Sequence, residues 1–527
     1  MRTPSPWRDW LLAALLYLPM AAVVLAHLLL PPDGRWPTGF LQYDQQGYMA
    51  MAREAWEGGA WPLFGLPGSD DPATPQHYLY LHIALLGALQ GLFELEPGRL
   101  YLAFGALSGL VFLRLAIALY RRVVPQRDGA ASLGLLLFAW GGGLFTLAGL
   151  GAGLAEGHLD YGTAVRFDPA GGFWFLNLGR NLFYGVEAWY HALALGLLLA
   201  LLDRRWRLAL SLLAALALSH PFTGLQLLLT VAAWFALERA LRCPAPLAGF
   251  GVAVALLLLL FLAYHFWLLP QGAEHRALMA RWSLDWSLGA LAMLLAYGLL
   301  LPPALLQLRR EGLAQARTRL LLTLLLVSLA LAQHDLLIAP RQPLHFTRGY
   351  IWMPLFLLGA PLLVAWLRSL LRQARPLALA LVALLLLDNA AWLTLQAVQN
   401  AGGFGAARTL SGNERAAFAA LSMPRYAGHL LVPAEPRLGY DATLYTPLVA
   451  WYGHEHATPD GEARLAALAA WPERGVEPAA WRARDLVFLL PDPAGTALPP
   501  APAGERERIA LPGGGEPLLL VRRPAQQ

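Results

Sequence analysis

Asp44 is the acid in this sequence whose position best suits chemistry. It follows the apolar run at 10–30 and opens an amphipathic stretch that extends from Tyr43 to Gly59. A carboxylate at a partly dehydrated membrane mouth can have a raised pKa and act as a base. Asp44 is therefore a candidate general base for a substrate held against the bilayer. The structural alternative is an exposed Asp that caps a helix beginning at Gln45.

The composition is that of a membrane protein. The chain has 527 residues, of which 57% are hydrophobic and only 14% are charged. This balance is too apolar for a soluble globule. The sequence contains no Lys, and its 39 basic residues, all Arg, lie beside apolar runs. The net charge of +5 therefore indicates no nucleic-acid partner, and the single cysteine, Cys243, excludes an internal disulfide framework.

Long apolar runs recur along the first three quarters of the chain. Each is interpreted as a helix that crosses the bilayer, because only helices or closed barrels satisfy their backbone there. About eleven spans are predicted on this basis. They cover residues 10–30, 99–120, 130–150, 185–202, 206–220, 222–240, 247–269, 285–308, 319–339, 350–371 and 376–396.

Arginine clusters between alternate runs set the predicted orientation. By the positive-inside rule they face the cytoplasm, which places the amino terminus inside and residues 397–527 outside. Whether residues 78–95 cross the membrane decides on which side every later loop lies. The segment is apolar, but it is short and contains polar residues. We interpret them as an outer-surface or re-entrant helix. If they crossed instead, the amino terminus would lie outside and Asp44 would lie in the cytoplasm.

The composition changes sharply at residue 397, where long apolar runs stop and Pro, Gly and charge increase. Short strand-like stretches alternate there with helical ones, which predicts a small α/β domain. The predicted fold is thus an α-helical polytopic membrane protein with a small extracytoplasmic α/β domain. The predicted transmembrane module covers residues 1–396 and includes an outer loop at 31–98 that carries juxtamembrane helices. The predicted α/β domain covers residues 397–527. The strands are expected at 429–433, 486–490 and 518–522, and the helices at 413–421 and 461–470.

This layout resembles the GT-C superfamily of integral membrane glycosyltransferases. The resemblance lies in a first span, a long outer loop that opens with an Asp, many further spans and a soluble outer domain. The local matches are Asp44 with Tyr48, the Ala-Arg-x-x-x-x-Gly-Gly tail at 52–59, Ser219-His220-Pro221-Phe222, and the stretch 452–459 followed by Arg464. Many members have a second acid directly after the first Asp. Here that residue is Gln45, which leaves Asp44 alone.

The resemblance implies an inverting transferase that takes a sugar from a polyprenyl-phosphate-linked donor on the outer face. Asp44 would deprotonate a hydroxyl of a glycan, lipid or protein acceptor. Tyr48 is a second-tier residue of the same site. The expected location is the inner (plasma) membrane, crossed many times. The alternatives are a transporter or flippase for lipid-linked glycans, and a non-catalytic binder of them.

The second outer loop, 151–184, supplies further candidates. Glu156, His158 and Asp160 could offer oxygen and imidazole ligands, as loop acids of the family sometimes do. No cofactor is certain from the sequence, and a divalent metal on Glu156 and Asp160 is left open. The alternative for each is a solvated polar loop, which the sequence favours over a metal site. His191, at the start of the next run, is a second-tier candidate for the same cavity.

Outer-side cations are the candidates for the donor phosphate. Arg341, His345 and Arg348 lie in one predicted outer loop, and Arg can hold a departing lipid phosphate with paired donors. Interfacial anchoring of these side chains is the alternative. His220 stands beside Pro221, which breaks an apolar stretch and suggests a wet cavity or an ordinary turn.

Two further features are less specific. Asp388 lies inside an apolar run, where an ionisable group is a functional hypothesis by default. His454 and His456 with Glu455 suggest metal binding, but a surface turn is favoured because no further ligands follow at a recognised spacing. In an enzyme, Asp44, the second-loop acids and the outer cations should converge on one cavity. In a carrier, polar residues should line a path across the membrane.

Overall fold

The computed structural model describes residues 6–66, 68–71, 74–172, 174–243, 248–281, 286–454, 458–474, 477–492 and 504–525. The chain forms two compact units. Unit 1 comprises Met1–Val23, Ala103–Trp267 and Ser283–Gln396, and unit 2 comprises Val24–Leu102, Leu268–Trp282 and Ala397–Gln527. Unit 2 therefore combines the carboxyl-terminal segment with the loop 31–98 that carries Asp44, which keeps the name outer loop after its predicted side. The division at 396/397 stays a prediction.

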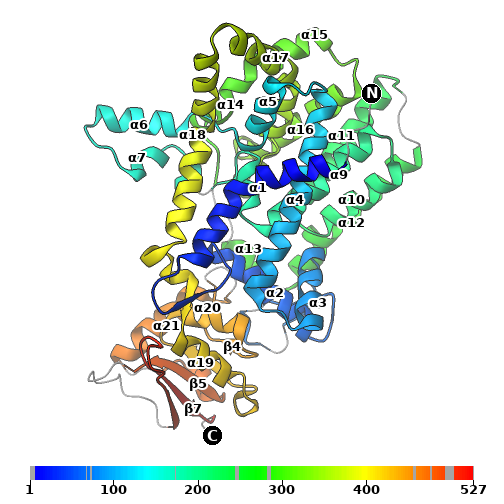
Figure 1. The fold of residues 1–527 in the computed structure, drawn as a ribbon. Helices are drawn as coiled ribbons and strands as arrows, with labels where there is room; N and C mark the ends of the chain where they lie inside the picture. The colour runs from blue at the N-terminus through cyan, green and yellow to red at the C-terminus, as the bar shows by residue number, and fades with distance from the viewer. Residues whose placement is uncertain are drawn as a thin grey trace. The chain divides into compact units, whose positions relative to one another are not determined.

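Unit 1 is a bundle of apolar helices, several of which run side by side in Figure 1. Eight described helices of the whole chain are long and apolar enough to cross a membrane, and the bent pair α5 and α6 would add a ninth. The fold is thus the predicted helical membrane protein. The principal helices are α1 (Pro6–Leu29), α4 (Pro97–Val123), α5 (Gly129–Trp140), α6 (Phe145–Ala155), α9 (Gly185–Leu202), α10 (Trp206–Ala217), α11 (Pro221–Ala240), α12 (Ala248–Ala263), α14 (Ala290–Tyr297), α15 (Leu301–Glu311), α16 (Ala316–Ala332), α17 (Trp352–Gln373) and α18 (Arg375–Gln399).

The predicted count of eleven spans is not confirmed. The run at 206–220 forms α10, which has 12 residues and is about 18 Å long, short of the roughly 30 Å hydrocarbon core. The run at 130–150 breaks at three successive glycines, and its two helices meet at 72°. A β-carbon at Gly143 would lie 2.1 Å from the carbonyl oxygen of Leu295, so glycine permits this close approach.

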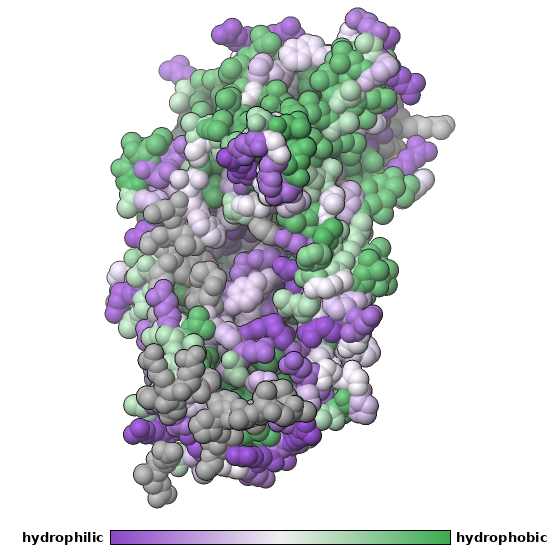
Figure 2. Space-filling model, turned by 90° about the vertical axis from the view of Figure 1, so that its left-hand side faces the viewer, coloured by the Kyte–Doolittle hydropathy of each residue, from purple (hydrophilic) through white to green (hydrophobic). Residues whose placement is uncertain are grey.

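Apolar side chains also cover much of the outside of unit 1. Figure 2 shows them as a wide green area over its helices. On α12, Leu256, Leu259 and Leu260 are all more than half exposed. Such a surface is unfavourable in water but matches a lipid solvent. The exposed leucines therefore agree with helices that face the bilayer.

In unit 2, the outer loop forms a helical hairpin of α2 (Tyr43–Glu57) and α3 (Leu81–Phe93). A β-carbon at Gly87 would lie 2.1 Å from the carbonyl oxygen of Ala52, so this glycine lets the two helices pack closely. With 13 residues, α3 is about 20 Å long and too short to cross a bilayer. The length therefore agrees with residues 78–95 not crossing, and their placement as an outer-surface or re-entrant helix stays a prediction. The orientation of the termini stays a prediction.

The carboxyl-terminal segment folds around a five-stranded sheet in the order β4-β3-β5-β7-β6. Strand β3 is parallel to β4 and β5, whereas β7 is antiparallel to β5 and β6. Both faces are buried, which explains the continuous apolar runs of the central strands. The predicted strands and helices are all present. Their bounds are β3 (Leu430–Pro433), β4 (Val449–Ala450), β5 (Leu486–Pro491), β6 (Glu505–Ile509), β7 (Leu518–Arg523), α19 (Gly412–Leu421), α20 (Pro436–Tyr445), α21 (Gly461–Arg474) and α22 (Ala479–Arg482).

A second, two-stranded sheet joins the outer loop to this segment. Strand β1 (Arg35–Pro37) pairs antiparallel with β2 (Thr409–Ser411). The Arg35 guanidinium reinforces the pairing through hydrogen bonds to the side chain and the carbonyl oxygen of Thr409, both 2.7 Å long. The loop that leads to Asp44 is therefore anchored on residues far away in the sequence.

Candidate functional site

Asp44 lies in the first turn of α2, and its carboxylate is not the helix cap. Gln42 caps the helix, because its side-chain oxygen accepts a hydrogen bond of 2.6 Å from the Asp44 N–H. The capping interpretation of Asp44 is therefore wrong. Its side chain is 48% exposed, and Oδ1 lies 3.2 Å from Nε2 of His454. The carboxylate thus contacts the carboxyl-terminal segment and remains accessible.

Aromatic rings surround the imidazole that contacts Asp44. His454 stacks on Tyr43 with ring centres 4.8 Å apart, and Tyr440 approaches its ring edge-on at 5.1 Å. The Tyr440 hydroxyl also donates to the carbonyl oxygen of Tyr43, at 3.0 Å. Burial is the main reason why the pKa of Tyr440 lies well above its usual value, so this ring stays neutral. His454 is thus held in a narrow slot between α2 and α20.

The residues that follow Asp44 are structural. Gln45, at the position of the second acid in many GT-C members, is buried and accepts a hydrogen bond of 2.8 Å from the Leu41 N–H. Gln46 is also buried and donates to Asp441 of α20 at 3.0 Å. Tyr48, one turn after Asp44, is half-buried and packs near the rings of His82 and Tyr101. The two glutamines thus fix the turn that presents Asp44.

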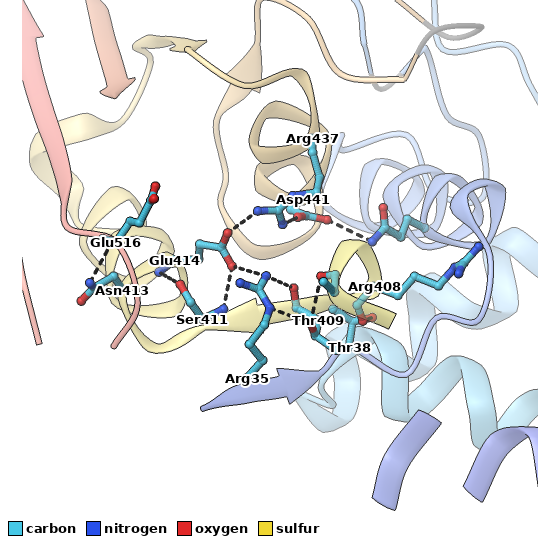
Figure 3. Close-up of polar contacts among 12 residues, drawn as sticks. Arg35, Thr38, Arg408, Thr409, Ser411, Asn413, Glu414, Arg437, Asp441 and Glu516 are labelled. Carbon is cyan, nitrogen blue, oxygen red and sulfur yellow. Dashed lines mark hydrogen bonds and ion pairs between the residues drawn. The ribbon is translucent and has the colours of Figure 1, made fainter. Parts of the chain in front are cut away.

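A charge network of buried acids and half-buried arginines supports this turn from the carboxyl-terminal segment (Figure 3). Arg437 pairs with both Asp441 and Glu414, and Glu414 also pairs with Arg35 of the outer loop at 3.2 Å. Glu414 further completes a capping box with Ser411 at the start of α19. The network therefore joins β1, α2, α19 and α20 into one support for Asp44.

The protonation of Asp441 makes the stability of the folded chain depend on pH. Burial raises the pKa of its carboxyl group to about 7, although Arg437 opposes the shift. The folded chain then holds the proton more tightly than the unfolded chain, so stability is lost as the pH rises from about 4 to about 7. In Asp441→Asn that loss is absent. We expect the unfolding temperature of wild type relative to Asp441→Asn to fall between pH 5 and pH 8. A difference in unfolding temperature that stays constant over this range would contradict the raised pKa of Asp441.

Unit 1 contains a second cluster, centred on Arg348. Its guanidinium forms an ion pair with Glu187 in the first turn of α9, and both side chains are buried. The same nitrogen lies 3.3 Å from Nε2 of His220, which caps α11 through Nδ1. His191, one turn after Glu187, has Nε2 only 2.7 Å from the carbonyl oxygen of Arg348. His191 and His220, both candidates from the sequence, thus lie beside Arg348, a predicted phosphate ligand.

His345 belongs to the same cluster. Its ring stacks on Phe222 at 4.4 Å and meets Trp174 edge-on at 5.0 Å, while the Arg348 guanidinium lies over Trp174 at 5.5 Å. Burial, with the nearby Arg348 charge, holds the pKa of His345 well below its usual value, so the ring is neutral. Arg341 differs, because it is exposed and its backbone N–H donates to His334. Of the three predicted phosphate ligands, the structure thus brings Arg348 and His345 together.

The second-loop acids have local partners. Asp160 forms a capping box with Thr163 at the start of α7 (Tyr161–Val165), and His158 lies 2.9 Å from it. Glu156 pairs with Arg166 at 2.5 Å. In the part of the chain that the structure describes, no three His, Cys, Asp or Glu side chains gather as a metal site would require. The metal hypothesis for Glu156 and Asp160 therefore gains no support from their arrangement. Glu455 and His456 lie outside the described residues.

The intramembrane acid Asp388 has a structural role. Its two carboxylate oxygens accept hydrogen bonds from the N–H groups of Phe145 and Thr146, at 3.2 and 2.8 Å. They satisfy the first turn of α6, which begins inside the bundle at the glycine break. Beside it, Asn389 accepts a hydrogen bond from the buried Arg180, which also pairs with Asp168 at 2.7 Å.

Sequence reasoning missed Glu187 and Arg180. Glu187 is an acid near the start of an otherwise apolar run, four residues before His191, and this spacing places both on one helix face. The same signal that drew attention to Asp388 could have identified it. Arg180 lies in a loop, where no periodicity distinguishes a buried arginine from an exposed one.

Known proteins match the chain only in fold. No protein-family model and no curated protein matches it. Among solved structures, apo ArnT from Cupriavidus metallidurans matches over 98% of each chain, with 13% identity and a TM-score of 0.49. AglB, the oligosaccharyltransferase from Archaeoglobus fulgidus, matches over 90% of this chain and 69% of its own, with 13% identity and a TM-score of 0.39. Both are GT-C membrane glycosyltransferases, the superfamily that the sequence resembles. At these values the matches assign neither an activity nor a residue's role.

Proposed function

We propose that this chain is an inverting membrane glycosyltransferase. It moves a sugar from a polyprenyl-phosphate-linked donor to an acceptor hydroxyl at the outer face, with Asp44 as the general base. The observation that carries the proposal is the placement of Asp44. Its carboxylate is half-exposed and does not cap its helix, yet a network of buried side chains fixes the turn around it. An acid held in this way is built to contact a ligand.

The Arg348 cluster supports a role in binding the donor phosphate. Glu187 compensates the charge of Arg348, so the pair can be buried without a bound anion. Nε of Arg348 is buried and has no hydrogen-bond partner among the described residues, which leaves a donor for a phosphate oxygen. His220 can add a second donor from the start of α11, where the helix dipole also favours an anion. Arg341 is retained as an outer contact for the same phosphate.

Donor turnover tests this function. The full chain would be reconstituted in liposomes with a panel of polyprenyl-phosphate-linked pentoses, hexoses and aminosugars, and mixed glycan, lipid and peptide acceptors would be added. We expect at least one donor to yield free polyprenyl phosphate, measured by mass spectrometry, together with a glycosylated acceptor. A transporter would instead move the intact donor between leaflets without releasing polyprenyl phosphate. That outcome, or binding without turnover for every donor, would overturn the proposal.

A further inference from the structure

The segment that contacts Asp44 is itself fixed in unit 2. Thr458 is buried, and its hydroxyl and its N–H both donate to the carbonyl oxygen of His454, at 2.8 and 2.9 Å. The same hydroxyl accepts a hydrogen bond of 3.1 Å from the Gly453 N–H. These bonds hold the backbone on both sides of residue 454. The position of the imidazole is therefore set by the fold rather than by Asp44 alone.

A second anchor connects this segment to the outer loop. Arg464 of α21 donates to the carbonyl oxygen of Trp451 and lies over its ring at 4.3 Å. Its other nitrogen pairs with Asp70 of the outer loop at 2.6 Å, and Arg484 also reaches Asp70 at 3.2 Å. Asp70 and Arg464 are largely buried. The stretch from Trp451 to His454 is thus attached to the outer loop at both ends, by Arg464 and by the contact with Asp44.

The chemistry of the contact determines what His454 can do. For Nε2 to bond to a carboxylate oxygen at 3.2 Å it must carry the hydrogen, so the imidazole is the donor. An N–H that donates to a carboxylate favours the charged form and limits the rotation of the group. One oxygen of Asp44 is then held by the imidazole. Among the described residues, the titratable groups beside this contact include Tyr43 on α2 and Tyr440 on α20.

We propose that His454 is the positioning residue of the base. Its Nε2–H holds Oδ1 of Asp44 and so orients the carboxylate. The acceptor hydroxyl transfers its proton to this carboxylate while the hydroxyl oxygen bonds to the anomeric carbon. The bond from that carbon to the phosphate oxygen breaks, and its electron pair leaves with the polyprenyl phosphate. The base is therefore assembled from the outer loop and the carboxyl-terminal segment together. This inference rests on the proposed function.

Two substitutions separate the parts of this role. His454→Phe keeps the ring stack on Tyr43 but removes the donor, whereas His454→Gln keeps a donor and removes the ring. We expect His454→Phe to lower kcat about tenfold to hundredfold with the donor KM unchanged, as the loss of a hydrogen bond to a charged group would. The acidic limb of its pH–rate profile should move up by about one pH unit, because the pKa of Asp44 rises when the N–H is lost. His454→Gln should recover most of the rate.

The control is His429→Phe, a half-buried histidine elsewhere in the carboxyl-terminal segment. It should leave both kcat and the pH profile unchanged. If Asp44→Asn abolishes transfer but His454→Phe keeps the wild-type rate and profile, the positioning role is wrong and the proposed function stands. If wild type transfers no sugar, the function fails instead. The contact is then tested by the unfolding temperatures of Asp44→Asn, His454→Phe and the double variant, where strictly additive shifts would overturn it.

Discussion

Replacing Arg348 with methionine should lower the free energy of unfolding by about 3–5 kcal/mol, because it leaves the buried Glu187 carboxylate without its partner. Both side chains are at least nine-tenths buried, so water cannot replace the lost interaction. The measurement is a denaturant titration of the full chain in detergent, monitored by tryptophan fluorescence. A loss of less than about 1 kcal/mol would show that the pair is not buried as described.

The double variant Arg348→Met/Glu187→Gln is the matched control for this prediction. It removes both charges, so most of the lost stability should return, since an uncharged pair of similar volume costs little to bury. Glu57→Gln provides the surface comparison, because Glu57 is paired with Arg53 but is more than half exposed. That change should cost less than about 1 kcal/mol. Equal losses in the single and double variants would contradict a charge-pairing role for Glu187.

Asp44→Asn should reduce kcat for sugar transfer by about 10²- to 10⁴-fold, the usual contribution of a positioned general base. Asn is nearly the same size but cannot take a proton, so binding of the donor should be almost unchanged. The fold should be retained, because Gln42 caps α2 and the Asp44 side chain is half-exposed, so any shift in the unfolding temperature should come from the lost contact with His454. The measurement is steady-state release of polyprenyl phosphate together with the unfolding temperature.

The control for Asp44→Asn is Glu57→Gln, which changes an exposed acid at the other end of the same helix. Its rate should match wild type. Asp44→Glu should retain part of the rate, since it keeps a carboxylate but displaces it by one methylene group. If Asp44→Asn retains more than about a tenth of the wild-type rate, another group is the base.

The sequence predicted the elements whose signal is local. The strands at 429–433, 486–490 and 518–522 are short, mostly apolar and bounded by turn residues, and they appear as β3, β5 and β7. The expectation that 78–95 does not cross came from its short apolar length and from the sides of the later Arg clusters, and the 13-residue helix found there is indeed too short to span a bilayer. The count of eleven spans is not confirmed, and hydropathy alone did not predict the bend at Gly141–Gly143.

The site depends on contacts that no local pattern carries. His454 lies 410 residues from Asp44, and the sequence favoured a surface turn at that position. The pairing of β1 with β2 was also invisible, because each strand has only three residues and gains its stability from the partner. Conversely, the acids Glu156 and Asp160 looked functional by type and spacing, yet their side chains have local partners in Arg166 and Thr163.

The anomeric configuration of the product tests the central claim most directly. A base that activates the acceptor permits a single displacement, so the sugar should carry the configuration opposite to that in the donor. The measurement is the anomeric proton coupling in the NMR spectra of the donor and of the purified product, made by wild-type protein in liposomes. Inversion, with product formation by Asp44→Asn slowed at least about a hundredfold, is the predicted result. A retained configuration would require a covalent intermediate or another nucleophile and would contradict Asp44 as the general base.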